Sequence, residues 1–133
     1  MGNLPKQERA EMYRSFLAEE GYSPRIDEDG DIIFKYEGGG YFIIVSEQDE
    51  EFFQLVYPNF WSIDSEAERE KVAKAALQAT AKTKVVKVYP VGDNTLASIE
   101  MFCCPPDAFK AVFQRSLSAI RSSLANFKEA MSE

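Results

Sequence analysis

Three aspartates at alternate positions, Asp27, Asp29 and Asp31, form the most distinctive arrangement of metal-ligating side chains in the sequence. Carboxylates at this spacing are typical of the calcium-binding loop of EF-hand proteins, which also needs glycine at its sixth position and glutamate at its twelfth. The chain has Ile32 and Gly38 at those two positions. We therefore interpret the aspartates as a polar turn between strands, and we predict no metal site.

The second motif with potential chemistry is a run of three glycines, Gly38-Gly39-Gly40. Glycine-rich loops bind phosphate groups where they lead from a strand into a helix, and a P-loop also needs a following lysine and Ser or Thr. Here the next residue is Tyr41, which begins an apolar stretch. This context favours a turn between two strands, and we predict no cofactor-binding residues.

Groups for acid-base or nucleophilic catalysis are few, because the 133 residues include no histidine. The absence excludes Ser-His and Cys-His pairs and removes the commonest general base and metal ligand. The two cysteines, Cys103 and Cys104, are adjacent, and we expect them to be free thiols in a reducing compartment. A site built only from carboxylates or lysine stays open. We predict a protein that is not an enzyme and has no catalytic residues.

Charge is distributed unevenly along the chain. Residues 1–68 contain 16 acidic and 5 basic residues, whereas residues 69–133 contain 6 acidic and 10 basic ones, giving a net charge of −7. The aromatic residues of the first half could stack on single-stranded nucleic acid, but only Lys35 lies among them to contact a phosphate backbone. We therefore expect no nucleic-acid partner. For the basic residues from Arg69 to Lys87 we favour a solvated surface over a site for an anionic partner.

Hydrophobic periodicity predicts the elements that would position these groups. Helices are expected at residues 4–20, at residues 65–80 and after Pro105-Pro106, and the second begins with a Ser65–Glu68 capping box. The predicted strands are residues 31–37, 41–46, 52–57, 84–91 and 95–104. The order is α-β-β-β-α-β-β-α, which indicates an α+β fold with an antiparallel sheet.

Length and composition favour one globular domain spanning residues 1–133. Hydrophobic residues make up 45% of the chain and charged residues 28%, which is globular composition. No apolar run reaches the roughly 18 residues that a membrane helix needs, so we expect no membrane association. The N-terminal residues 1–9 are polar, unlike a signal peptide. We expect a cytoplasmic protein.

Apolar residues occupy both faces of several predicted strands, although helices on one side of a sheet would cover only one face. We infer that this excess serves an unidentified protein partner, and we expect a homodimer. An alternative is a regulator that senses a small ligand in an aromatic pocket near Tyr57, Phe60 and Trp61. The candidate partner or dimer surface consists of Tyr41, Ile43, Val45, Phe52, Tyr57, Phe60 and Trp61.

Local patterns along nearly the whole chain carry a resemblance to a known family. They include Phe16-Leu17 with Gly21-Tyr22, the strand Gly40–Val45, the alanine-rich residues 73–80 leading into Lys84–Val88, and the turn Gly92–Asn94. In this order of elements the chain resembles the type III secretion (Tir-type) chaperone fold. In these details it is more similar to the YbjN-like group of sensory transduction regulators.

The resemblance implies a small, acidic, cytoplasmic and non-enzymatic protein. Proteins of that fold often dimerise and bind other polypeptides through apolar patches and exposed strand edges. The YbjN-like group has no settled biochemical activity, so the resemblance supplies no catalytic residues. It adds a chaperone-like, regulatory role to the expectation of a protein-binding module.

Overall fold

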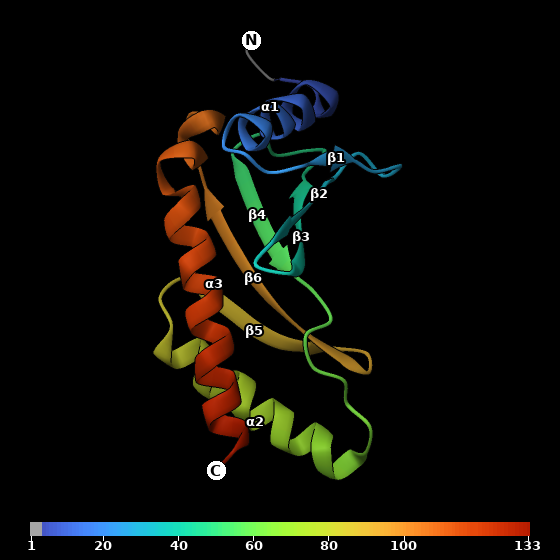
Figure 1. Cartoon of the computed structure of the whole chain (residues 1–133), viewed down its shortest axis with the longest axis vertical. Helices are drawn as coiled ribbons and strands as arrows, with labels where there is room; N and C mark the ends of the chain where they lie inside the picture. Colours follow the sequence, from blue (N-terminus) through green and yellow to red (C-terminus); the bar gives the residue numbers. More distant parts are fainter. Residues whose placement is uncertain (1–3) are drawn as a thin grey trace. The chain divides into compact units, whose positions relative to one another are not determined.

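The computed structural model describes residues 4–133 and confirms the predicted α+β fold class and order of elements (Figure 1). Two short elements were not predicted, the strand β1 and the 3-10 turn η1 before the last helix. The helices are α1 (Lys6–Glu19), α2 (Glu66–Lys82) and α3 (Phe109–Met131), and η1 is Pro106–Ala108. The strands are β1 (Arg25–Ile26), β2 (Ile32–Tyr36), β3 (Gly39–Val45), β4 (Phe52–Tyr57), β5 (Val86–Val91) and β6 (Asn94–Phe102).

The six strands form one antiparallel sheet in the order β1-β2-β3-β4-β6-β5, and the chain divides into two compact units. The first unit is Met1–Val56 with Glu100–Phe113, and the second is Tyr57–Ile99 with Gln114–Glu133. The first contains 15 acidic and 6 basic residues, and the second 7 acidic and 9 basic. The net charge of −7 is therefore divided into −9 and +2. The single domain of residues 1–133 stays a prediction, because contacts alone do not report independent folding.

In β2 and β3 of the first unit, alternate residues are buried, as the period of two along a strand requires. Tyr41, Ile43 and Val45 of β3 are almost completely buried, whereas Phe42 and Ile44 between them are half-buried. The neighbouring strands β2 and β4 contribute to the same buried face, since their registers place Ile32 and Leu55 opposite Ile43. One face of this part of the sheet is thus closed, and the other is not.

Aromatic rings from α1 and from the first turn of α3 close that face. The ring of Tyr13 lies 4.8 Å from that of Phe109 and 6.1 Å from that of Phe53. Phe53 and Phe109 stack at 5.3 Å, and Phe113 reaches Phe34 of β2 at 5.9 Å. These edge-to-face and stacked contacts stabilise the unit beyond the burial of apolar area alone.

The two loop motifs of the first unit have structural roles. Asp27 Oδ1 accepts hydrogen bonds from the backbone N–H groups of Asp29 (2.9 Å) and Asp31 (3.0 Å), and Asp31 Oδ1 accepts one from the N–H of Val45 at 2.8 Å. The turn after β2 uses Glu37 and Gly38, which have φ of 51° and 82°. Glycine tolerates this left-handed region without strain. The aspartates therefore build a turn between strands, as the sequence indicated, whereas of the three glycines only Gly38 lies in the turn and Gly39 and Gly40 belong to β3.

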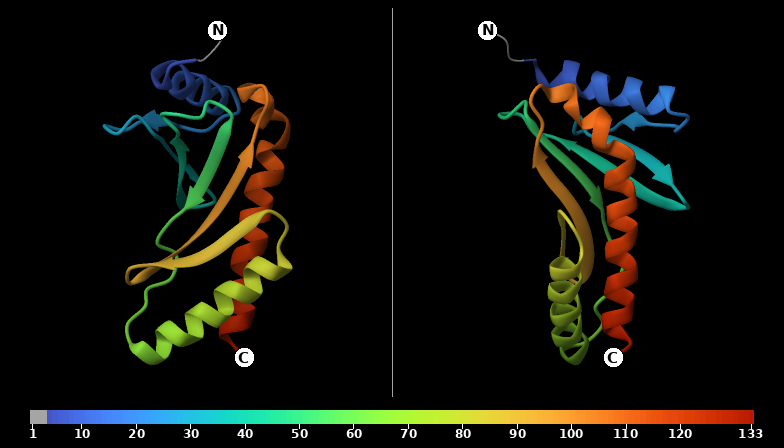
Figure 2. Two further views of the ribbon diagram at one scale, coloured as in Figure 1. Left: turned by 180° about the vertical axis from the view of Figure 1, so that it is seen from behind. Right: turned by 90° about the vertical axis from the view of Figure 1, so that its left-hand side faces the viewer.

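In the second unit, α2 runs alongside the outer edge of β5 (Figure 2). Thr80 joins the two elements: its hydroxyl accepts a hydrogen bond from the N–H of Val88 at 2.9 Å and contacts the Val88 carbonyl oxygen at 3.3 Å. An unpaired strand edge is a template for adding another strand. On β5 the Thr80 hydroxyl takes the place of a neighbouring strand at Val88, and α2 covers the edge.

The two long helices of the second unit follow the predicted signals. Ser65 caps α2 by accepting a hydrogen bond from the N–H of Glu68 at 3.1 Å, as its capping sequence predicted. The buried residues of α2 are small, with Val72 as the largest of them. Along α3 one side of the helix is apolar and largely buried, including Leu117, Ile120 and Phe127 at 0% exposure.

Replacing Thr80 by valine removes the hydroxyl and keeps the side-chain volume. Because the N–H and carbonyl of Val88 then lose their side-chain partner, we expect Thr80→Val to lower the free energy of unfolding by about 1–3 kcal/mol. Chemical denaturation measures this loss. Thr80→Ser retains the hydroxyl and should lose less; equal losses in both variants would contradict a hydrogen-bonding role.

Burial raises the pKa of Tyr13 to about 12, from an ordinary value of 10.0. A pKa that is higher in the folded state stabilises the fold below pH 10, and the stabilisation is lost as the pH rises from 10 towards 12. We expect the wild type to lose about 2 kcal/mol between pH 9 and 11.5 through this residue, since one pKa unit corresponds to about 1.4 kcal/mol.

Tyr13→Phe should lack that alkaline loss when the free energy of unfolding is measured at both pH values. Tyr89→Phe, at a more exposed tyrosine, is the matched control and should retain it. An equal alkaline loss in Tyr13→Phe and the wild type would show that Tyr13 does not carry the effect.

Candidate functional site

The open face of the first unit carries a group of apolar side chains that the helices leave uncovered. Phe102, at the end of β6, is 76% exposed, and its ring lies 6.2 Å from that of Phe52 in β4. Beside them Gln54 Nε2 donates a long hydrogen bond to Glu100 Oε2, at 3.4 Å. Strand alternation and register assign five partly or fully exposed apolar residues to this face, which we call the open face: Ile33, Phe42, Ile44, Phe52 and Phe102.

Carboxylates border the open face near the end of β6. The Glu51 carboxylate, by a side-chain hydrogen bond and by its charge, raises the pKa of Cys104, and the charge of Glu50 adds to the effect. Burial raises the pKa of Cys103. Both thiols are free, as predicted, and a raised pKa disfavours the reactive thiolate. The edge of the open face is therefore negatively charged beside Cys104, and both cysteines are poor nucleophiles.

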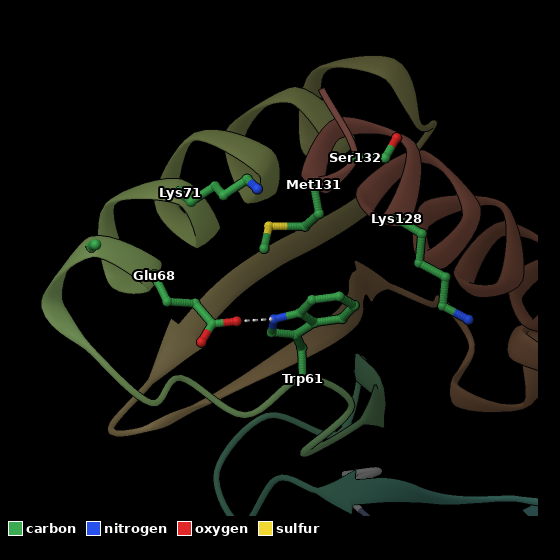
Figure 3. Close-up of a pocket in the computed structure, with 7 residues that line it drawn as sticks. Trp61, Glu68, Lys71, Lys128, Met131 and Ser132 are labelled. Atoms are coloured by element: carbon green, nitrogen blue, oxygen red, sulfur yellow. Dashed lines mark hydrogen bonds between the residues drawn. The ribbon is translucent and has the colours of Figure 1, made fainter.

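A pocket of about 440 Å³ lies in the second unit, between the start of α2 and the end of α3 (Figure 3). Trp61 forms one wall, and its Nε1–H donates a hydrogen bond of 3.1 Å to Glu68 Oε2. The other oxygen of Glu68 accepts from the N–H of Asp64 at 3.3 Å. The lining residues are Trp61, Ala67, Glu68, Lys71, Lys128, Met131 and Ser132.

The chemistry of this pocket combines an aromatic wall with two cations and with the Glu68 carboxylate, whose oxygens accept from Trp61 and Asp64. Met131 points towards the indole ring of Trp61, and Lys71 and Lys128 lie to either side of it (Figure 3). The indole also makes an edge-to-face contact with Phe127, with the ring centres 5.4 Å apart. An apolar ring with an anionic substituent fits such a site, because the ring contacts the indole and methionine while a lysine pairs with the charge.

The structure divides the predicted partner surface among three places. Tyr41, Ile43 and Val45 are 0–3% exposed and belong to the core of the first unit, so they form no surface there. Their place is taken by the alternate residues of β3, Phe42 and Ile44, because the rings of α1 and α3 cover the opposite face. The sequence pattern had assigned the wrong face of this strand to the surface.

The other predicted residues keep partial exposure. Phe52 lies on the open face, whereas Tyr57, Phe60 and Trp61 belong to the second unit. There Tyr57 stacks on Phe60 at 6.2 Å, and Phe60 contacts Phe127 edge-on at 5.2 Å. Of the three residues of the predicted aromatic pocket, Trp61 lines the pocket of Figure 3.

The prediction missed Phe102, Lys128 and Met131. A signal for Phe102 was present: it alternates with Ser98 and Glu100 along β6, so it shares a face with polar residues. Lys128 and Met131 come from α3, far from Trp61 in sequence, and no local pattern predicts that they meet it.

Arg69, the first of the basic residues noted in the sequence, has a structural role. Its guanidinium donates to the Gly92 carbonyl oxygen at 2.9 Å and pairs with the Asp93 carboxylate in the β5–β6 turn. Within residues 4–133 no helix is long and apolar enough to cross a membrane. In the same residues no three His, Cys, Asp or Glu side chains are grouped to hold a metal ion.

Comparison with known proteins supports the fold and names no function. No protein-family model and no curated protein matches the chain. Among solved structures, one match is the crystal structure of an uncharacterized protein from Methanothermobacter thermautotrophicus. The two chains are 16% identical, the match covers 92% of this chain and 94% of that one, and the TM-score is 0.57. The likeness shows a shared fold, and the similarity to the YbjN-like group stays a prediction.

Proposed function

We propose that the chain is a non-enzymatic, protein-binding regulatory module whose open face binds a polypeptide partner. The single observation that carries the proposal is the 76% exposure of Phe102 beside Phe52, at one end of a row of half-buried apolar residues. Large contiguous apolar patches on the surface of a soluble domain mark interaction sites. The role is cytoplasmic and chaperone-like in the sense of the YbjN-like resemblance.

Charge identifies the kind of segment that fits the open face. The first unit has a net charge of −9, and Glu50, Glu51 and Glu100 lie around the end of β6. A partner segment that places apolar residues on Phe52 and Phe102 would bring its flanking residues close to these carboxylates. Lysine or arginine at those flanking positions would pair with the carboxylates and speed association. The proposed partner is therefore a segment with alternating apolar and basic residues.

The covered edge of β5 disfavours strand addition at that edge of the sheet. Strand addition needs free backbone N–H and carbonyl groups along an edge. On β5 the Thr80 hydroxyl already contacts both groups of Val88. The proposal therefore assigns affinity to side-chain contacts with Phe52 and Phe102, which single substitutions can remove.

Phe102→Ser should abolish most peptide binding without loss of stability, because the side chain is exposed. A displayed random-peptide library is selected against the wild type, and the enriched peptides are synthesised for fluorescence polarisation. We expect enriched peptides to alternate apolar and basic residues. Burial of one phenylalanine contributes about 1.5–3 kcal/mol, so Phe102→Ser should weaken binding about 10- to 100-fold.

Leu77→Ser is the matched control, because Leu77 is 72% exposed on α2, in the other unit. It should bind the selected peptides as the wild type does. The proposal is wrong if no peptide is enriched, or if both variants bind equally.

The proposal includes a homodimer, in which a second copy covers the open face when no partner is bound. Two copies would then bring like charges together, and such repulsion weakens with added salt. Light scattering on the samples used for peptide binding reports the dimer, which should compete with peptide. A monomeric wild type that binds peptide would remove the homodimer and leave the polypeptide partner in place.

A second candidate function is the sensing of a small ligand in the Trp61 pocket. The observation that favours it is the wall formed by Trp61 and Met131 with Lys71 and Lys128 beside it (Figure 3). The ligand class that fits is an aromatic carboxylate. A ligand here would regulate the module through the helix ends that form the pocket.

Because the chain has a single tryptophan, its fluorescence reports on this pocket directly. We expect a panel of aromatic carboxylates to change Trp61 emission saturably, and we expect Lys71→Gln/Lys128→Gln to weaken the effect at least fivefold. Aromatic amines of the same shape serve as controls and should have little effect. Equal responses to amines and carboxylates, or none to either, would contradict the ligand site.

A further inference from the structure

A separate pocket of about 350 Å³ lies in the second unit, where the end of α2 meets α3. It is formed by residues that are distant in sequence and that the sequence pattern did not bring together. None of the described side chains that line it is acidic, in a chain with 22 Asp and Glu residues. The lining residues are Lys82, Thr83, Lys84, Arg115, Ser118, Ala119, Ser122 and Asn126.

Three cations converge on this hollow. Lys84 and Arg115 are exposed, and within residues 4–133 neither makes an ion pair or a hydrogen bond through its side chain. Lys82 lies 3.8 Å from Glu129, an exposed pair that contributes little. In the second unit, which has a net charge of +2, these cations thus have charge available for an external anion.

Hydrogen-bond donors lie between the cations. Ser118, Ser122 and Asn126 are spaced by four residues, so successive turns of α3 bring them to one side of the helix. Asn126 Nδ2 donates to Thr83 Oγ1 at 3.0 Å, and the Thr83 hydroxyl donates to the Ala79 carbonyl oxygen at 2.7 Å. These two bonds fix the end of α2 against α3 and thereby hold the two walls of the pocket together.

We propose that this pocket binds a phosphoryl group. A phosphoryl group carries close to two negative charges at neutral pH and presents three acceptor oxygens. The planar guanidinium of Arg115 can pair with two of them, while Lys84 supplies a second charge and the serine hydroxyls donate hydrogen bonds. A carboxylate has half the charge and no third oxygen, so it satisfies fewer of these donors. The group can come from a free phosphate compound or from a phosphorylated side chain.

The test titrates isotope-labelled full-length protein with inorganic pyrophosphate at constant ionic strength, maintained with chloride. Backbone amide shifts at residues 82–84 and 115–126 should change saturably. Arg115→Gln/Lys84→Gln should weaken the affinity at least tenfold. The matched control, Lys74→Gln/Lys110→Gln, removes two positive charges from exposed lysines outside the pocket and should change the affinity less than twofold.

A second arm replaces pyrophosphate with capped phosphoserine and with inorganic phosphate. Tighter binding of phosphoserine than of phosphate would identify a phosphorylated side chain as the source, and the reverse would identify a free phosphate compound. The proposal fails if shifts are spread evenly over the lysines, if both double variants weaken binding equally, or if no anion saturates the site. Ser122→Glu, which places a carboxylate in the pocket, should abolish binding and keep the fold.

Discussion

The stacked contact of Phe53 with Phe109, at 5.3 Å, decides which face of the sheet in the first unit is closed. Tyr13 of α1 joins the same contact from the other helix, so both helices approach one face of the strands. A strand sends successive side chains to opposite faces, and the residues between the buried ones therefore meet solvent. The exposure of Phe102 and the half-burial of Phe42 follow from this one-sided cover. The proposed binding surface is thus a consequence of how the core is closed.

In the second unit the main constraint is the outer edge of the strand β5. β5 is the last strand of the sheet order, and its free backbone groups would invite pairing with another chain. The hydroxyl of Thr80 meets those groups at Val88 and ties α2 to the strand edge. With α2 held there, its two ends form pockets with α3: one walled by Trp61 and one by Lys84 and Arg115. Both pockets thus depend on the helix that covers the edge.

The sequence predicts elements well because element signals are local. Ser65 and Glu68 specify a helix start by themselves, and the alternation in β4 places its strand at the observed residues. The choice of face is not local. Tyr41 and Phe42 are both aromatic, and the helix residues that close one face of the sheet lie elsewhere along the chain, so Tyr41 is 2% exposed whereas Phe42 is half-buried. The sequence pattern therefore indicated excess apolar surface but not which residues provide it.

Long-range assembly likewise explains why the pockets escaped prediction. In the sequence alone, Lys84 is one member of a basic stretch and Arg115 is one polar residue of a long helix. The two residues line one pocket because α3 lies against the end of α2, where Asn126 donates a hydrogen bond to Thr83. The members of the basic stretch also differ in their surroundings, since Arg69 pairs with Asp93 whereas Lys84 makes no ion pair within residues 4–133. Composition limits what such sites can do but cannot locate them.

The lack of histidine affects the pH dependence of the charged surfaces as well as catalysis. Histidine is the side chain whose ordinary pKa lies between pH 5 and 8, and this chain has none. The pKa values of both cysteines are raised, further from that range. No histidine can therefore change the charge of the open face or of the phosphoryl pocket as the pH passes through the neutral range. For a phosphoryl ligand, whose second pKa is about 6, pH dependence would arise in the ligand rather than in a histidine of the protein. Ionic strength, which at about 0.1 M largely screens exposed charges that lie more than about 10 Å apart, is the variable to which both surfaces should respond.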